Sequence, residues 1–145
     1  MFEQESLAQR SRRMQQQRAD SLRTGVYVPP GWPEMVRPPG SPGWERTAVV
    51  FLLDCCPADY RGYPVLQRHP IVLARFAHRF VEGQLAATKS NLAGLRASLA
   101  DHVDRQVLDD AADVLLTEDA RLVRVRRAVS LVEEALAGVE FRRRL

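Results

Sequence analysis

The most constraining feature of the sequence is a stretch that contains no proline after Pro70 and carries a repeating apolar pattern. A proline is tolerated in the first turn of a helix, because its missing N–H would have no partner there. Core-type positions then recur at alternating intervals of three and four residues. The first run comprises Ile71, Ala74, His78, Val81, Leu85, Thr88, Leu92, Leu95 and Leu99. The second run comprises Leu108, Ala111, Leu115, Glu118, Leu122, Val125, Val129, Val132, Leu136 and Val139. A seam with a period of 3.5 is typical of coiled coils and left-handed helical bundles.

The two runs are separated by a short polar break, ADHVD at residues 100–104. Short connections join antiparallel neighbours in helical bundles. The sequence therefore predicts an all-α fold built on a long antiparallel helical hairpin, with helices at about 70–99 and 104–139. Folding the chain at residues 101–103 places His78 opposite Val125 and Leu85 opposite Glu118.

The hairpin carries more apolar residues than two helices can bury against each other, so it needs a cover. The segment at about 44–56, WERTAVVFLLDCC, is strongly apolar and can be read as a helix or a buried strand. We favour a helix, because the neighbouring elements are helical and no second strand is present to pair with it. This helix and a second subunit are the two candidate covers, which predicts a three- or four-helix assembly and allows a homodimer.

The first 43 residues differ in composition from the rest of the chain. Residues 1–24 are rich in Arg and Gln and poor in large apolar groups, which predicts a helical arm. Residues 25–43 hold six of the nine prolines and four of the eight glycines, so we expect an extended, polyproline-like connector. Tyr27, Trp32 and Met35 indicate that it lies against a surface. The predicted organisation is an arm at 1–24, a connector at 25–43 and a helical domain at 44–145.

Composition and cysteine content indicate an ordinary globular protein inside the cell. The 145 residues suffice for one domain, and the hydrophobic content of 46% is typical of globular chains. The N-terminus lacks the apolar run of a signal peptide. The longest apolar run, Ala48 to Leu53, is far too short for a membrane span, which takes about 20 residues. We therefore expect a cytoplasmic protein without a membrane span.

The adjacent cysteines Cys55 and Cys56 are the most conspicuous chemical groups. With Asp54, His69 and His78 they offer donors for a metal, but neighbouring thiols lack the spacing that zinc motifs use. Free cysteines are often buried, so we interpret the pair as structural, with a metal site and a redox-active thiol as alternatives. No short catalytic motif is present. We expect a non-enzymatic protein without a cofactor and see no indication of a small-molecule substrate.

Two polar residues interrupt the apolar seam. His78 and Glu118 both occupy core-type positions, where an unpaired polar group is costly. Lys89, the only lysine, is a candidate partner for Glu118, as are Arg121 and Arg124 on neighbouring helical positions. The simplest interpretation is that these buried polar groups fix the register or the oligomeric state, as polar residues do in coiled coils. Their separation along the predicted hairpin, about 10 Å, disfavours a shared site.

Charge is unevenly distributed along the predicted hairpin. Residues 101–119 carry seven acidic residues and one arginine, so the tip is acidic. The base of the hairpin and both termini are basic. A solvated charged surface is the simplest explanation, and an anionic partner is the alternative. The arginines that would contact a partner or an anion are Arg10, Arg12, Arg13, Arg18, Arg75, Arg79, Arg124, Arg126, Arg127, Arg142, Arg143 and Arg144.

These patterns give two main hypotheses of function. The first is a non-enzymatic protein–protein interaction or regulatory module, in which the helical hairpin docks a partner protein or a second copy of itself. The second is a nucleic-acid-associated protein that uses the arginine-rich arm, the hairpin base and the C-terminus. Against the second stands the scarcity of aromatic residues among the arginines, since single strands are usually held by stacking platforms. A small-molecule or metal site near Cys55 and Cys56 ranks third.

Overall fold

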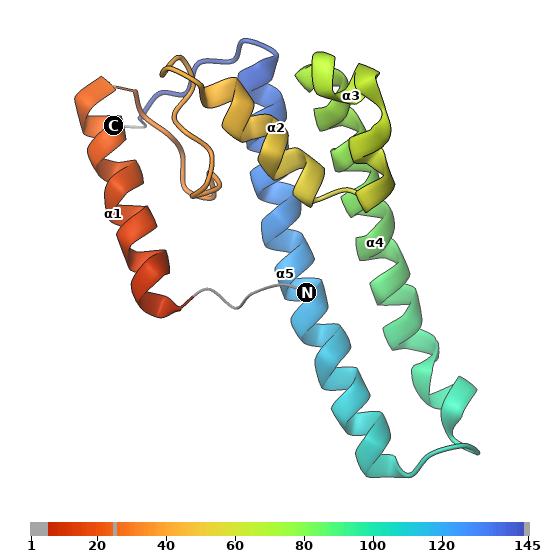
Figure 1. Cartoon of the computed structure of the whole chain (residues 1–145). Coiled ribbons are helices and arrows are strands. Elements are labelled where there is room, and N and C mark those ends of the chain that lie inside the picture. Colours follow the sequence, from red (N-terminus) through yellow and green to blue (C-terminus); the bar gives the residue numbers. More distant parts are fainter. Residues whose placement is uncertain (1–5, 25, 144–145) are drawn as a thin grey trace.

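The computed structural model describes residues 6–24 and 26–143. The regular elements among these residues are all helices, with no strand (Figure 1). Side chains of the first helix are described as far as residue 16. The predicted all-α class is therefore confirmed. In chain order the elements are α1 (Leu7–Thr24), α2 (Trp44–Asp54), the 3₁₀ helix η1 (Ala58–Gly62), α3 (Pro64–Arg68), α4 (Pro70–Leu99) and α5 (Arg105–Leu136).

The helices α4 and α5 form the predicted long antiparallel hairpin (Figure 1). Pro70 occupies the first turn of α4, as expected. The carboxylate of Asp104 caps α5 by accepting a hydrogen bond from the Val107 N–H at 3.0 Å, which satisfies one of the donors that a helix start leaves free. After α5 ends at Leu136, Gly138 takes a positive φ of 91°, a conformation suited to glycine.

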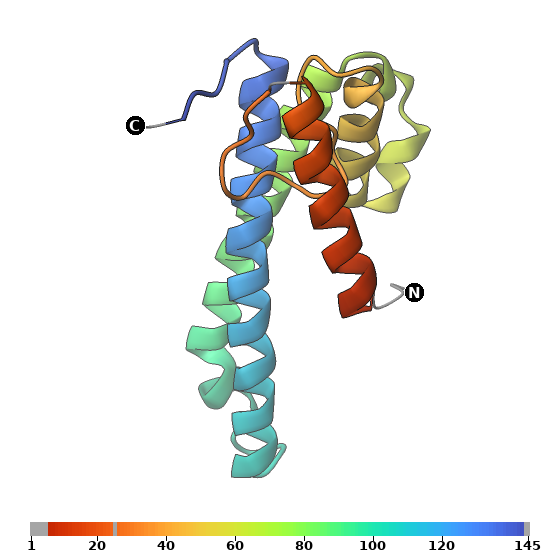
Figure 2. The ribbon, with the colours of Figure 1, turned by 90° about the vertical axis from the view of Figure 1, so that its left-hand side faces the viewer.

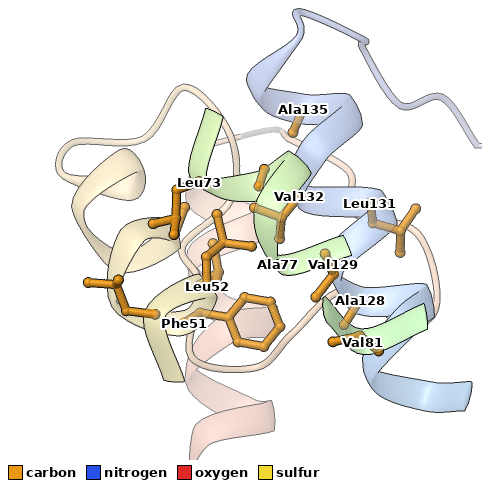
Figure 3. Packing of buried hydrophobic residues seen from close by; sticks show 14 of the residues in the cluster. Phe51, Leu52, Leu73, Ala77, Val81, Ala128, Val129, Leu131, Val132 and Ala135 are labelled. Atoms are coloured by element: carbon orange, nitrogen blue, oxygen red, sulfur yellow. The ribbon is translucent and has the colours of Figure 1, made fainter. Parts of the chain in front are cut away.

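The apolar segment after the connector is a helix, and it forms the cover that the hairpin needs. α2 contacts both α4 and α5. Its Leu52 is fully buried, and Figure 3 shows Phe51 and Leu52 close to Ala77 of α4 and Val129 of α5. Burying one leucine side chain in this way stabilises the fold by about 1.5–3 kcal/mol. This three-helix packing forms the main hydrophobic core.

The core occupies only one half of the hairpin. We call residues 70–85 and 121–136 the base, and residues 86–120 the distal half. α2 and α3 lie beside the base, whereas the distal half consists of α4 and α5 alone (Figure 1). Within the distal half only Leu95 and Leu108 are buried. The expected packing of the apolar segment against the hairpin is therefore confirmed, and it is confined to the base.

The connector, residues 26–43, lies on the base as expected but is not simply extended. It makes successive tight turns, in which the N–H groups of Trp32 and Val36 donate to carbonyls three residues earlier. Trp32 is only 6% exposed, and its indole N–H donates to the Val36 carbonyl at 2.9 Å. Met35, by contrast, is exposed. The prolines thus favour turns here rather than a continuous polyproline helix, because the fixed φ of proline also suits the second residue of a tight turn.

The arm forms a helix that lies to one side of the helical body, and Figure 2 views the molecule from that side. Every described side chain of α1 is exposed. Leu7 is 83% exposed and Met14 is 56% exposed. Because isolated helices gain little from propensity alone, most helical stability comes from packing of an apolar face. Within the described part of α1, residues 7–16, the apolar side chains Leu7 and Met14 are therefore exposed to solvent.

Candidate functional site

The two cysteines lie at the C-terminal end of α2 as free, partly buried thiols. Burial raises the pKa of Cys55 to about 12, with further contributions from Cys56 and Asp54. Burial also raises the pKa of Cys56 to about 11, against a lowering effect of Arg61. The thiolate is the reactive and metal-binding form. Within the described residues, no three His, Cys, Asp or Glu side chains are grouped as metal ligands.

His78 lies in a polar cluster between α4 and α5. Its side chain is 18% exposed and contacts Glu82 through Nε2, while its Nδ1 lies 3.8 Å from Glu133 Oε1. Arg75 Nη2 also reaches Glu133 Oε1, at 3.0 Å. His78 therefore has the acidic Glu133 as a neighbour on α5, in addition to Glu82 on its own helix.

Glu118 is at the edge of the seam and not buried within it. Its side chain is 40% exposed and forms an ion pair with Arg121, three residues further along α5. The Arg121 Nε–Oε2 distance is 2.9 Å. This hydrogen bond lowers the pKa of Glu118. The partner is thus a neighbour on the same helix rather than Lys89, and an exposed pair of this kind contributes little to register.

The predicted arginine set divides into separate groups. Arg10, Arg12 and Arg13 are exposed on α1, whereas the side chain of Arg18 and the whole of Arg144 lie outside the described residues. On α4, two of the basic charges are paired: Arg75 with Glu133, and Arg79 with Glu82 at 3.5 Å. On α5, Arg124 is exposed and Arg126 is half-buried. The remaining three members are Arg127, Arg142 and Arg143.

Those three arginines line one cleft of about 810 Å³ at the base of the hairpin, which we call the base cleft. The connector, the last turns of α5 and the tail that follows α5 all contribute to it. The lining residues are Tyr27, Pro29 and Pro30 of the connector, Arg127, Leu131 and Glu134 of α5, and Phe141, Arg142 and Arg143 of the tail.

The connector holds two of the cleft residues in place. Gly31 has a φ of +97°, and a Cβ at this position would lie 2.9 Å from Arg127 Cγ. The backbone of the connector therefore runs directly along the aliphatic stem of Arg127. Phe141 makes an edge-to-face contact with the buried Trp32, with 5.8 Å between ring centroids. Contacts of this geometry are the preferred ones for aromatic pairs, so the tail is fixed against the connector.

The charge of the base cleft is positive and uncompensated within the described structure. No described carboxylate forms an ion pair with Arg127, Arg142 or Arg143. The Arg143 guanidinium lies over the ring of Tyr27, 5.5 Å from its centroid. Glu134 supplies the one acidic group of the lining. Three arginines thus line a partly apolar cleft, an arrangement suited to an anion with a planar apolar body.

Sequence reasoning found the arginines of this cleft and missed its aromatic residues. Tyr27 belongs to the connector and Phe141 to the tail, far apart in the sequence. The structure places both beside the arginines of the base. The arginines of the cleft therefore have aromatic residues beside them in the folded structure, although aromatic residues are scarce among the arginines of the sequence. Two signals were available: Phe141 directly precedes Arg142, and Tyr27 and Trp32 in a proline-rich connector indicated contact with a surface.

A second surface of interest covers the distal half of the hairpin. It carries five large apolar residues that are between 36% and 66% exposed: Leu99, Val103, Val107, Val114 and Leu116. Val107 and Val114 are one heptad apart and so share a face of α5. The same 35-residue stretch contains seven acidic and three basic side chains. The distal half therefore combines apolar patches with negative charge.

Searches against protein-family models, curated proteins and solved structures find no match to this chain. Among the described residues, no helix has both the length and the apolar character needed to traverse a bilayer.

Proposed function

We propose that this protein is a non-enzymatic interaction module that pairs with a second copy of itself through the distal half of its hairpin. One observation carries the proposal: only Leu95 and Leu108 are buried between residues 86 and 120, while five large apolar side chains there are exposed. A two-helix hairpin leaves one side of each helix uncovered, and unpartnered apolar faces of this kind mark interaction sites. A further helix would convert the distal half into a bundle.

Charge complementarity supports a second copy of the chain as the partner. The distal half has a net negative charge, with seven acidic and three basic residues, whereas α1 has five arginines and one aspartate. α1 leaves the molecule at the base. If two copies lie antiparallel, the base of each is beside the distal half of the other. Each α1 can then cover the acidic distal half of its partner, and the apolar pair Leu7 and Met14 would face the exposed valines.

The expected affinity is modest. Burying the exposed parts of the apolar side chains on both copies is worth about 10 kcal/mol, at about 1 kcal/mol for each half-exposed side chain. Association and helix ordering oppose this by about 4–15 kcal/mol. The arginine–carboxylate pairs add attraction that is screened by salt. With an opposing cost near the lower end of that range, about 6 kcal/mol remains, and we expect a salt-sensitive dimer with a Kd of roughly 10–100 μM.

Mass measurement tests the pairing directly. The monomer mass is 16.4 kDa, and light scattering or sedimentation should give a mass approaching twice this value as concentration rises. The double substitution Val107→Glu and Val114→Glu should abolish the increase. Val50→Glu, at a position that is also about half exposed but lies on α2, is the matched control and should leave it intact. A constant monomer mass at every concentration would contradict the proposal.

A charge exchange between two variants tests the role of the arm. Arg12→Glu with Arg13→Glu changes the net charge of α1 from +4 to 0, and Asp110→Arg with Asp113→Arg changes that of the distal half from −4 to 0. Each variant should therefore be monomeric, because the arm and the distal half no longer attract each other. Mixed together, the two variants should form a heterodimer, because the unchanged arm of one copy can then lie on the unchanged distal half of the other. If α1 instead covers the distal half of its own chain, mixing will change nothing.

A further inference from the structure

The base cleft is separate from the distal surface and contains groups that self-association does not use. Its three guanidiniums have no carboxylate partner among the described residues, and two aromatic side chains lie in the same lining. We propose that the base cleft binds a nucleoside phosphate, either free or as a unit of a single-stranded nucleic acid. The phosphate is held by Arg127 and Arg142, and the base stacks against the Arg143–Tyr27 pair.

The phosphate position follows from the arginines. Arg127 belongs to α5 and Arg142 to the tail, so the two arginines line the cleft from two separate segments. Arginine binds phosphate in a bidentate manner, and charge-assisted hydrogen bonds of this type are roughly twice as strong as neutral ones. The stem of Arg127 lies along the connector at Gly31, which restricts its rotamers before any ligand binds. A restricted side chain loses less entropy on binding.

The position of the base follows from the flat groups of the cleft. The Arg143 guanidinium already lies over the Tyr27 ring, at 5.5 Å, and the opposite face of a guanidinium plane can stack on a nucleobase. Phe141, Leu131 and the connector prolines provide further apolar surface. The volume of about 810 Å³ lies within the range typical for small-molecule sites, about 300–1,000 Å³. The cleft thus accommodates one nucleotide unit.

Glu134 bears on which base the cleft prefers. A carboxylate in the lining can accept hydrogen bonds from the exocyclic amino group of a base. Cytosine and adenine carry such a group on the relevant edge, whereas uracil and thymine carry a carbonyl. We therefore expect cytidine and adenosine phosphates to bind more tightly than uridine phosphate. A paired base is stacked within its duplex and cannot enter the cleft, so duplex should bind more weakly than a single strand.

The test is a binding titration of the intact chain with labelled oligo(C), oligo(U) and duplex, together with AMP, CMP and UMP as competitors. Tight oligo(C) binding with little competition by CMP identifies a strand as the ligand, and efficient competition by CMP identifies a free nucleotide. Either result supports the proposal. Absence of binding at low salt, or equal binding of duplex and single strand, overturns it.

Variants of the full-length chain locate the binding. Arg127→Gln with Arg142→Gln should weaken binding about tenfold or more and make its salt dependence shallower, because fewer counterions are released. Tyr27→Leu retains the apolar volume but removes the stacking partner of Arg143, and should weaken binding severalfold. Glu134→Gln should reduce the preference for oligo(C) over oligo(U). Arg46→Gln, an exposed arginine on α2, is the control. If the cleft variants bind like the control, the base cleft is not the site.

Discussion

Trp32 anchors the connector to the base of the hairpin, and its replacement by alanine tests how much the connector contributes to stability. The side chain is 6% exposed, donates a hydrogen bond to the Val36 carbonyl and contacts the Phe141 ring. Truncating a buried aromatic residue to alanine costs about 3–5 kcal/mol. The Val36 carbonyl also loses a donor, although water can reach it once the indole is gone. We expect Trp32→Ala to lower the free energy of unfolding by about 4 kcal/mol.

Urea unfolding followed by far-ultraviolet circular dichroism measures this loss without relying on tryptophan fluorescence. For a domain of this size, the same change corresponds to a fall in Tm of roughly 8–16 °C. Trp44→Ala is the matched control. Trp44 is only half-buried at the start of α2, so its loss should cost roughly half as much. If Trp32→Ala costs less than Trp44→Ala, the connector is a peripheral strap and the argument for a connector-built cleft is refuted.

Three further predictions concern individual residues. Cys55, with a pKa of about 12, should react with thiol reagents more slowly than Cys56, with a pKa of about 11, and both more slowly than in the unfolded chain. Because the folded pKa values lie above the unfolded value of 9.0, the unfolded chain releases these protons first, and the free energy of unfolding should fall as the pH rises above about 9. Gly31→Ala should cost about 1–3 kcal/mol in thermal or urea unfolding, and more than Gly40→Ala, whose added Cβ meets nothing. Asp104→Ala removes the cap of α5 and should cost about 1 kcal/mol by the same measurement; an unchanged stability would show that the cap is replaced by water.

Much of the fold could be predicted because it depends on local patterns. The 3.5-residue periodicity and Pro70 define α4, and the polar break with Asp104 defines the start of α5. The relative placement of the two helices is a different matter. The approach of His78 to Glu133 brings together polar side chains of two helices, and a pattern of apolar residues does not reveal such a contact.

The candidate sites were predictable in part, for a similar reason. Basic residues such as Arg127 and Arg142 are recognisable in the sequence as a charged group. The convergence of Tyr27 and Phe141 on these arginines depends on tertiary contacts, which a periodicity does not encode. Glu118 shows a prediction that failed. A position in an apolar seam predicts burial only where neighbouring helices cover that position, and the side chain of Glu118 is 40% exposed.

The contact between Trp32 and Phe141 also constrains when the fold can be completed during synthesis of the chain. The connector emerges from the ribosome early, but the aromatic ring that fixes it belongs to the tail beyond α5. Synthesis proceeds at about 5–20 residues per second, so the indole of Trp32 waits several seconds for its partner. During that interval a nascent chain displays a proline-rich segment with an unburied tryptophan, which makes this segment the place where a chaperone would engage the growing polypeptide.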